Sequence, residues 1–315
     1  MKITVSRPLA GGLFVLGLAL SPAGCSSPPA GEETPADEEA AEPGAAGNGG
    51  PSWNRVASLL ADGQVVFGIF SGERTPETAM EMAQQELADF IFYSLERGPF
   101  DLPTMSAYQE ALSPPDARGS ANPHPVLLRI PPIRDGMDEA AERTAAGLDA
   151  GTYGIVFPHV ETADEARHAV ASMTLAGAGG LRGDADPEAA RVFGVSPEDY
   201  AARAAVWPLD PAGELLSFLL IEDVIGIENA LAITSVPGIS IVSPGPGDLR
   251  RAYEGDMEAV EAAIQTVLAA CLEAGVPCGI TAGPDDIAMR IEQGFRVFIV
   301  TSPEALAVGH EAAGR

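Results

Sequence analysis

The stretches LLSFLLIED (215–223) and ISIVSPGPGDL (239–249) decide the fold that we expect for this chain. Each contains an apolar run typical of a buried β-strand, followed by an acidic residue, Glu222 in the first and Asp248 in the second. If the two runs are neighbouring parallel strands, their ends lie roughly 5 Å apart. Two carboxylates at one edge of a sheet, separated by a Gly/Pro loop, predict a site for a hard divalent cation, Mg²⁺ or Mn²⁺.

Strand-like runs of this kind alternate with helical patterns from residue 53 onward. Several runs are apolar throughout, which favours parallel strands that are covered on both faces. No G-x-G-x-x-G turn follows the first run, so a dinucleotide-binding fold has no support. The sequence therefore predicts an α/β fold, a closed (β/α)₈ TIM barrel. The expected strands cover residues 64–70, 88–96, 125–130, 153–158, 214–222, 238–243, 276–281 and 296–301.

Helices are expected between these strands. The clearest is 256–274, where apolar residues recur at helical spacing until Gly275 ends the pattern. The stretch 174–212 is expected to be irregular, with a short helix near 197–205. The other expected helices cover residues 75–87, 102–111, 137–151, 163–173, 226–233 and 284–293.

The first 25 residues predict a bacterial lipoprotein-like signal peptide that ends at Cys25. Lys2 and Arg7 precede an apolar run at 9–20, which is too short to span a bilayer as a permanent helix. We expect lipidation of Cys25, export, and attachment to a membrane of the cell envelope through the lipid anchor only. The alternative is an ordinary cleaved signal with an incidental cysteine.

Residues 26–52 are rich in Pro, Ala, Gly and acidic residues and predict a disordered linker. Residues 53–315 then form the barrel, close to the usual size of this fold. The net charge of −27 makes nucleic acid an improbable partner. Cys271 and Cys278 lie in apolar surroundings and are expected to be core thiols rather than a disulfide or a metal site.

Polar residues at the C-terminal ends of the expected strands are the candidates for the site. Arg129 ends an apolar run, where an unpaired charge is costly, and its guanidinium could bind a carboxylate or an enolate oxygen. The alternative is a structural salt bridge to a neighbouring acid. Gly245 and Gly247 would let backbone N–H groups approach a bound anion. The strand-end polar residues are Ser94, Glu96, Arg97, Arg129, His159, Glu222, Asp248 and Thr281.

Several linked motifs resemble the HpcH/HpaI aldolase and citrate lyase family from about residue 64 to 300. The resemblance implies a barrel of the phosphoenolpyruvate/pyruvate type, a divalent metal, and cleavage or formation of a carbon–carbon bond next to a 2-oxo acid. It also implies a homo-oligomer, often a hexamer, although little sequence remains after the last strand for the C-terminal helix that family members exchange. The motifs are FIFYSLERGPFD (90–101), VLLRIPP (126–132), YGIVFPHVETADEA (153–166), LRGD (181–184), VWPLDPAGE (206–214), LLIED (219–223) and GPGDL (245–249).

The resemblance also implies roles for individual residues. Glu222 and Asp248 match the family's metal ligands, and Arg129 matches the arginine that stabilises the pyruvate enolate. Gly247 matches the position whose backbone N–H meets the substrate carboxylate. Asp149 matches the acid that makes the family's catalytic histidine more basic.

Three positions depart from the family pattern. Ser94 stands where the family has Asp, Leu220 where it has Gln, and Arg97 where it has the catalytic histidine. An arginine stays protonated and cannot act as a general base. Arg97 could form an ion pair with Asp149, or bind an additional carboxylate of a different substrate, or point away while His159 acts as the base.

The function expected from this sequence is that of a metal-dependent carbon–carbon lyase of the class II aldolase type. Its substrates would be 2-oxo acids such as 4-hydroxy-2-oxo acids, cleaved through a metal-stabilised enolate to release pyruvate or a related 2-oxo acid. The alternative is a non-catalytic, envelope-tethered binder of metal and oxo or dicarboxylic acids, because Arg97 replaces the histidine. A structural lipoprotein that merely retains the barrel is a third interpretation.

Overall fold

The computed structural model describes residues 52–113, 124–184 and 187–315. The predicted signal peptide with Cys25, and the predicted linker up to residue 51, lie outside the described residues. Ser52 was assigned to the linker but joins the folded domain, because its hydroxyl donates a 2.7 Å hydrogen bond to Glu214. No helix in the described part of the chain has the length and apolar character needed to cross a membrane.

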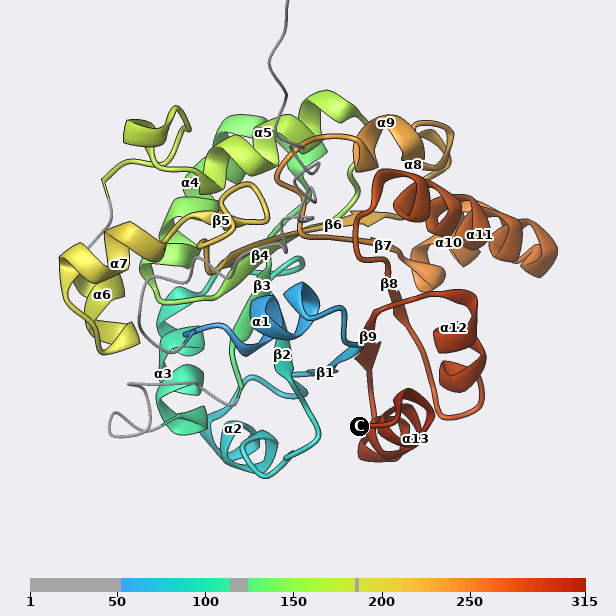
Figure 1. Cartoon of the computed structure of the whole chain (residues 1–315), viewed down its shortest axis with the longest axis horizontal. Coiled ribbons are helices and arrows are strands. Elements are labelled where there is room, and N and C mark those ends of the chain that lie inside the picture. Colours follow the sequence, from blue (N-terminus) through green and yellow to red (C-terminus); the bar gives the residue numbers. More distant parts are fainter. Residues whose placement is uncertain (1–51, 114–123, 185–186) are drawn as a thin grey trace, which may run out of the picture. The chain divides into compact units, whose positions relative to one another are not determined.

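Within these residues, eight parallel strands form the barrel, as the alternating pattern predicted (Figure 1). Strand β1 pairs with both β2 and β9, and β6 pairs with both β4 and β7. A parallel bridge between Val242 and Cys278 joins β7 to β8 and closes the ring. A short extra strand, β5 (Val206–Trp207), pairs with the beginning of β6. The barrel strands are β1 (Val66–Phe70), β2 (Phe90–Ser94), β3 (Val126–Arg129), β4 (Gly154–Phe157), β6 (Leu215–Ile221), β7 (Ile241–Pro244), β8 (Gly279–Thr281) and β9 (Val297–Val300).

Helices surround this ring of strands (Figure 1). The longest of them, α11, begins after Asp256, whose side chain accepts hydrogen bonds from two first-turn N–H groups, and ends at Gly275 in the left-handed region. The described helices are α1 (Arg55–Ala61), α2 (Pro76–Met82), α3 (Leu102–Leu112), α4 (Met137–Asp149), α5 (Ala163–Met173), α6 (Pro187–Phe193), α7 (Pro197–Arg203), α8 (Val224–Glu228), α9 (Ala230–Thr234), α10 (Pro246–Ala252), α11 (Met257–Ala274), α12 (Ile287–Gln293) and α13 (Pro303–Ala313).

The structure differs from the expected helices in several places. The expected Gly/Pro loop after β7 contains α10, which begins at Pro246, so Asp248 lies in the first turn of a helix rather than at a strand end. Proline suits this position because its fixed φ matches the helix and its missing N–H would be unpaired anyway. The expected helix 226–233 is divided into α8 and α9, and the stretch 174–212 contains α6 in addition to the short helix expected near 197–205, which is α7. Helix α1 was not among the expected helices. Helix α13 follows β9, where little sequence was expected to remain.

An aromatic cluster ties the start of the domain to the stretch that contains α6 and α7. The Trp53 ring stacks on Tyr200 with 5.8 Å between ring centroids, and lies 5.3 Å from Phe193. The guanidinium of Arg203 lies 4.3 Å from the centroid of the same indole ring. These contacts explain why Trp53 is buried although it is near the edge of the described chain.

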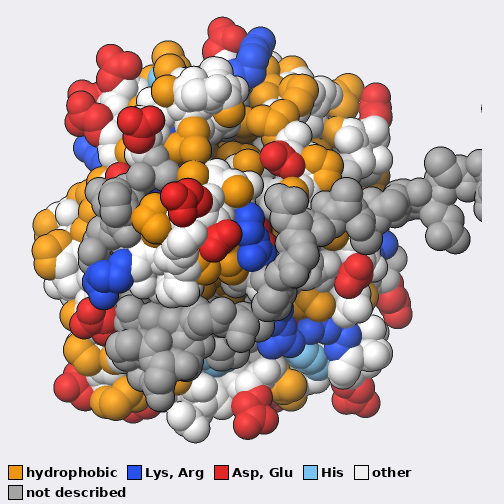
Figure 2. All heavy atoms as spheres, turned by 60° about the vertical axis from the view of Figure 1, so that its left-hand side comes forward, with side chains coloured by type: hydrophobic (Ala, Val, Ile, Leu, Met, Phe, Trp, Pro, Cys, Tyr) orange, Lys and Arg blue, Asp and Glu red, His pale blue; other side chains and the backbone are white. Residues whose placement is uncertain are grey.

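The two cysteines of the described chain are buried free thiols, as expected. Cys271 on α11 faces Cys278, and burial raises the pKa of the Cys278 thiol well above its usual value. On the face drawn in Figure 2, acidic side chains are spread among apolar ones rather than gathered in one region.

Candidate functional site

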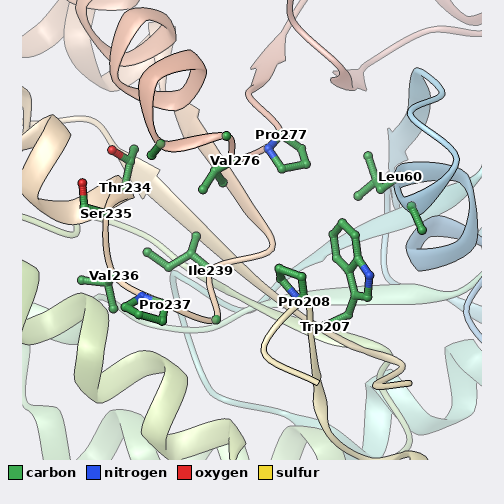
Figure 3. Close-up of a pocket in the computed structure, with 14 residues that line it drawn as sticks. Leu60, Trp207, Pro208, Thr234, Ser235, Val236, Pro237, Ile239, Val276 and Pro277 are labelled. Carbon is green, nitrogen blue, oxygen red and sulfur yellow. The ribbon is translucent and has the colours of Figure 1, made fainter. Parts of the chain in front are cut away.

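A cavity of about 600 Å³ lies at the N-terminal edge of the barrel (Figure 3). Its lining includes Ile239, which precedes β7, and Pro277, which precedes β8, together with Trp207 and Leu60. No titratable side chain lines it, so it offers neither an acid–base group nor a metal ligand. The polar residues that follow the strands lie at the opposite edge, and they form the candidate site.

Glu222 directly follows β6, whose neighbour is β7, so the two expected strands are adjacent and parallel as predicted. The residue is only 2% exposed. Gly245 makes room for it, because a Cβ at that position would lie 2.1 Å from Glu222 Oε2. The Gly245 N–H donates to the Ile221 carbonyl at 3.3 Å, so Gly245 provides space for the carboxylate rather than a donor for an anion.

Burial is the main reason that the pKa of Glu222 is raised, to about 7. The nearby carboxylate of Asp248 raises it further, whereas His159 opposes the shift. His159 and Arg129 compensate only part of the desolvation of this carboxylate, so its pKa remains raised. A divalent metal at this position would supply the remaining compensation.

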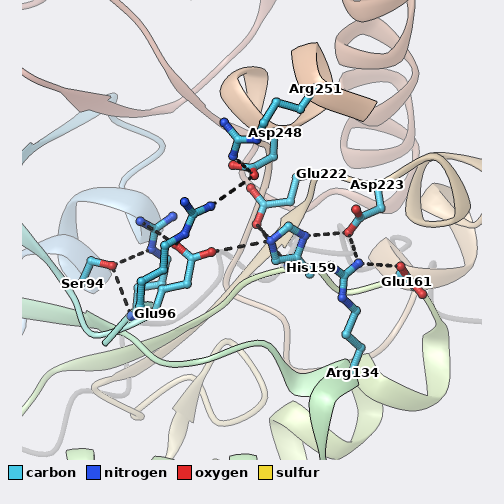
Figure 4. Close-up of polar contacts among 11 residues, drawn as sticks. Ser94, Glu96, Arg134, His159, Glu161, Glu222, Asp223, Asp248 and Arg251 are labelled. Atoms are coloured by element: carbon cyan, nitrogen blue, oxygen red, sulfur yellow. Dashed lines mark hydrogen bonds and ion pairs between the residues drawn. The ribbon is translucent and has the colours of Figure 1, made fainter. Parts of the chain in front are cut away.

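His159 follows β4 and lies at the centre of the site (Figure 4). Its backbone has a φ of 55°, in the left-handed region that few side chains other than Asn, Asp and His adopt. Its Nδ1 lies 2.7 Å from Asp223 Oδ2. Its Nε2 lies 3.6 Å from Glu96 Oε1 and 3.7 Å from Glu222 Oε1. The contact with Glu96, followed by the charges of Glu222 and Asp223, raises the pKa of His159 to about 9.

Glu96 connects this histidine to Arg129. Its Oε2 lies 3.0 Å from Arg129 Nη2, and the Arg129 Nε donates to Ser94 Oγ at 3.0 Å. The His159 contact is the first cause of a lowered pKa at Glu96, with Arg129 contributing. The salt bridge that was the alternative explanation of Arg129 is therefore present. The predicted binding of a carboxylate or enolate oxygen by Arg129 stays a prediction.

Arg97 and Asp248 lie near each other at the entrance to the site. Arg97 has a side chain that is 73% exposed, and its Nη2 is 3.9 Å from Asp248 Oδ1. Arg251, one turn further along α10, forms an ion pair with the same oxygen of Asp248. Arg97 thus reaches toward the site rather than away from it, and its guanidinium remains largely exposed to solvent beside Asp248.

The structure does not bring Asp149 to this site. Asp149 ends α4, which runs antiparallel to the strands, so its carboxylate lies at the N-terminal edge of β4, opposite the site. It pairs there with Arg182 at 3.0 Å. The hypothesis of an Arg97–Asp149 ion pair is therefore wrong for the single chain. Asp149 also does not lie beside the other predicted site residues.

Gly247, Leu220 and Thr281 are the remaining positions that the sequence singled out. Gly247 lies in the first turn of α10, and open space faces the position where its Cβ would be. First-turn N–H groups have no partner inside the helix. Leu220, where the resemblance led us to expect Gln, is buried in the barrel and offers the site no polar group. Thr281 ends β8, and no described contact joins it to the cluster.

Among the residues that the structure describes, one group of side chains has donor atoms close enough to share a metal ion. Glu96, His159 and Glu222 each offer one atom, and these atoms lie within 4.8 Å of one another. Carboxylate oxygens and an imidazole nitrogen are suitable donors for a divalent cation, so the residues present fit such an ion. Asp248 is outside this group, and its predicted role as a ligand beside Glu222 stays a prediction.

Two participants were not singled out from the sequence. Glu96 was noted at a strand end but given no role, and Asp223 was passed over although it directly follows Glu222. Glu222 and Asp223 are adjacent acidic residues at the end of the most apolar run, and this pattern could have identified Asp223 as a site candidate. Nothing local to Glu96 predicted that it would bridge Arg129 and His159, because those residues come from two other strands.

Comparison with known proteins places the chain in a family. The model of the HpcH/HpaI aldolase/citrate lyase family matches residues 67–302. The 5-keto-4-deoxy-D-glucarate aldolase of Salmonella newport (strain SL254) is 27% identical over 259 residues, which cover 80% of this chain and 91% of that protein. An HpcH/HpaI family protein from Burkholderia cenocepacia J2315 has a TM-score of 0.66 and 24% identity, with 83% of this chain and 97% of that chain covered. An HpcH/HpaI aldolase from Desulfitobacterium hafniense DCB-2 has a TM-score of 0.63 and 20% identity, with 82% and 93% covered. The two structures share the fold of this chain, and because the family model spans most of its length, the chain belongs to the HpcH/HpaI aldolase/citrate lyase family.

Proposed function

We propose that this protein is a metal-dependent carbon–carbon lyase that cleaves a 4-hydroxy-2-oxo acid and releases pyruvate or a related 2-oxo acid. The observation that carries the proposal is the buried Glu222 carboxylate, which faces His159 and Glu96 beside Arg129 at the C-terminal ends of the strands. Membership of the HpcH/HpaI family supports it.

The lysine content of the chain favours a metal over a Schiff base. Aldol cleavage needs an electron sink, which a protein provides either as a lysine imine or as a bound metal. The only lysine in this sequence is Lys2, which precedes the expected barrel residues 53–315 in the sequence. A divalent metal, Mg²⁺ or Mn²⁺, when bound by Glu222 and Asp248, would polarise the 2-oxo group and stabilise the negative charge that develops on it.

The chain's own residues would orient the substrate and share that charge. Arg129 is held in place by Ser94 and Glu96, so its guanidinium needs no rearrangement to stabilise a developing enolate oxygen. The Gly247 N–H would bind the substrate's carboxylate at the open first turn of α10. As the C3–C4 bond breaks, its electron pair would pass through C3 to the 2-oxo oxygen and form the enolate. A water molecule would take the proton of the C4 hydroxyl, which becomes a carbonyl, and C3 would then take a proton from water.

Arg97 would select a substrate that carries a second carboxylate. It cannot accept the hydroxyl proton, but its guanidinium is exposed at the entrance to the site, where it could bind a distal carboxylate. The relative from Salmonella newport is named for a glucarate derivative, a compound of this dicarboxylate type. We therefore place dicarboxylic 4-hydroxy-2-oxo acids first among the candidate substrates.

A second candidate function is a binder of metal and oxo acids that does not turn them over. The presence of Arg97 at the position of the family's histidine favours it. Pyruvate release from a panel of 4-hydroxy-2-oxo acids with Mg²⁺ or Mn²⁺ separates the two functions. No release from any member by folded, metal-loaded protein, together with metal-dependent oxalate binding in calorimetry, would support the binder.

The Arg97→His variant sharpens this comparison. If the wild type is an enzyme adapted to a dicarboxylate, the variant loses activity on that substrate while the activity on a monocarboxylic analogue is retained or increased. If the variant creates aldolase activity where the wild type has none, the wild type is the binder.

The proposed location is the cell envelope, through lipidation of Cys25. Membrane fractionation and mass spectrometry of the mature N-terminus test this: the wild type should be found in the membrane fraction with an acylated Cys25, and Cys25→Ala should be soluble. A homo-oligomer is proposed from family membership, and light scattering of the purified domain would measure its mass.

A further inference from the structure

His159 has the environment of a metal-binding histidine rather than that of a histidine that only forms hydrogen bonds at the edge of the barrel. Its Nδ1 is taken by Asp223 at 2.7 Å, whereas its Nε2 faces two carboxylate oxygens, of Glu96 and Glu222 (Figure 4). The two Nε2 distances, 3.6 Å and 3.7 Å, are longer than a good hydrogen bond. Two donors that each lie about 2.1 Å from one cation are separated by roughly 3 to 4 Å. The Nε2 spacing therefore suits a shared cation better than direct hydrogen bonds.

Asp223 and Arg134 fix the orientation of the imidazole. Metal-binding histidines usually donate their second ring N–H to a carboxylate, which sets the tautomer and leaves the other nitrogen for the metal. Asp223 Oδ2 accepts this bond and is itself held by Arg134 Nη1 at 2.7 Å. Arg134 also binds Glu161 Oε1 at 2.8 Å, so the support extends to a residue two positions after His159.

The backbone at this position contributes as well. The left-handed conformation of His159, with a φ of 55°, lets its backbone N–H donate to Glu222 Oε1 at 3.2 Å while its ring turns toward the same residue. A non-glycine residue in this region is strained and persists where the surroundings enforce it. Here the hydrogen bonds to Glu222 and Asp223 enforce it.

We propose that His159 Nε2 is a metal ligand in this protein, together with Glu222 and Glu96, and that the site consequently prefers Mn²⁺ or another first-row transition ion over Mg²⁺. A site made of oxygen ligands alone suits Mg²⁺, whereas an imidazole nitrogen raises the affinity for first-row transition ions such as Mn²⁺. Asp223 acts as a positioning residue for this ligand. The inference rests on the metal that the proposed function assigns to Glu222 and Asp248, and it adds His159 and Glu96 as ligands and a preference among ions.

Pulsed electron paramagnetic resonance on the Mn²⁺-loaded protein tests the ligand without measuring activity. We expect modulation from an imidazole ¹⁴N bound directly to Mn²⁺. The His159→Asn variant should abolish this signal, and asparagine is chosen because it tolerates the left-handed backbone. The matched control is His168→Ala on α5, a histidine outside the site whose Nε2 contacts the Met137 carbonyl, and this variant should keep the signal.

Calorimetric titration of the same proteins tests the preference. The wild type should bind Mn²⁺ more tightly than Mg²⁺. His159→Asn should weaken Mn²⁺ binding about tenfold or more and should weaken Mg²⁺ binding less. Asp223→Asn should weaken Mn²⁺ binding by about 10-fold to 100-fold with the ¹⁴N signal altered rather than lost.

The possible outcomes separate this inference from the proposed function. Mn²⁺ binding without a ¹⁴N signal, or equal loss of Mn²⁺ and Mg²⁺ affinity in His159→Asn, overturns the inference and leaves the lyase proposal standing. A ¹⁴N signal in a protein that releases no 2-oxo acid supports the inference and counts against the lyase. Failure of the wild type to bind Mn²⁺ overturns the inference as well.

Discussion

Replacing Glu222 by glutamine should stabilise the metal-free protein at high pH and remove its response to metal. The side chain is 2% exposed, and the pKa of its carboxyl is raised from 4.5 to about 7. Because this acid binds its proton more tightly in the folded state, stability is lost as pH rises from the unfolded to the folded pKa, and the full cost is present above pH 7. A pKa shift of this size corresponds to a loss of about 3 kcal/mol in the free energy of unfolding. Glutamine also removes the negative charge that supports the His159 imidazolium, so the net gain should lie at about 1 to 3 kcal/mol.

Urea unfolding in EDTA at pH 8 and pH 5 measures this effect. We expect Glu222→Gln to be more stable than the wild type at pH 8, with the difference falling below about 1 kcal/mol at pH 5. Adding Mn²⁺ at about 1,000 times its Kd should reverse the order, because this stabilises the wild type by about 4.1 kcal/mol and should not stabilise the variant. A variant that is less stable in EDTA at pH 8, or that gains as much from Mn²⁺ as the wild type, would refute the reasoning.

Three further outcomes follow from the described contacts. Arg129→Lys should lower kcat/KM for the best substrate by about 100-fold, because a lysine cannot hold both Ser94 and Glu96 while meeting the substrate; an unchanged value in steady-state kinetics would contradict its role. Trp53→Ala should cost about 3 kcal/mol in unfolding experiments, because it empties the centre of the aromatic cluster; a loss below 1 kcal/mol would show that the cluster contributes little. Cys271 and Cys278 should not react with a thiol reagent in the native protein and should both react after unfolding, because they are buried and the Cys278 pKa is raised.

The barrel was predictable because its signal lies within short stretches of sequence. The all-apolar run at β6 and the run at β7 predicted adjacent parallel strands, and their register confirms it. Glu222 and Arg129 were found for the same reason, since a charged residue at the end of a buried strand is visible without knowledge of its neighbours.

The composition of the site was harder to predict because it depends on contacts between strands. His159 receives its environment from Glu96 after β2 and from Asp223 after β6, and no local spacing brings these together. Asp149 was misplaced because the resemblance implies a role for it but not the edge of the barrel at which it lies. Helix α4 runs antiparallel to the strands, so its last residue, Asp149, lies at the edge opposite the site. The helix at Pro246 was missed because its glycines suggested a loop, although the proline at its first position favoured a helix.

The measurement that tests the central claim most directly is pyruvate release in a metal-depleted and reconstituted protein. The protein is stripped with a chelator, offered a dicarboxylic 4-hydroxy-2-oxo acid, and then supplied with Mn²⁺ or Mg²⁺ while a coupled assay follows the 2-oxo acid. We predict no release before metal is added, release after it, and none at any metal concentration in Glu222→Gln. Equal release by the stripped wild type, or by the metal-supplied variant, would contradict the claim that Glu222 holds the metal on which carbon–carbon cleavage depends.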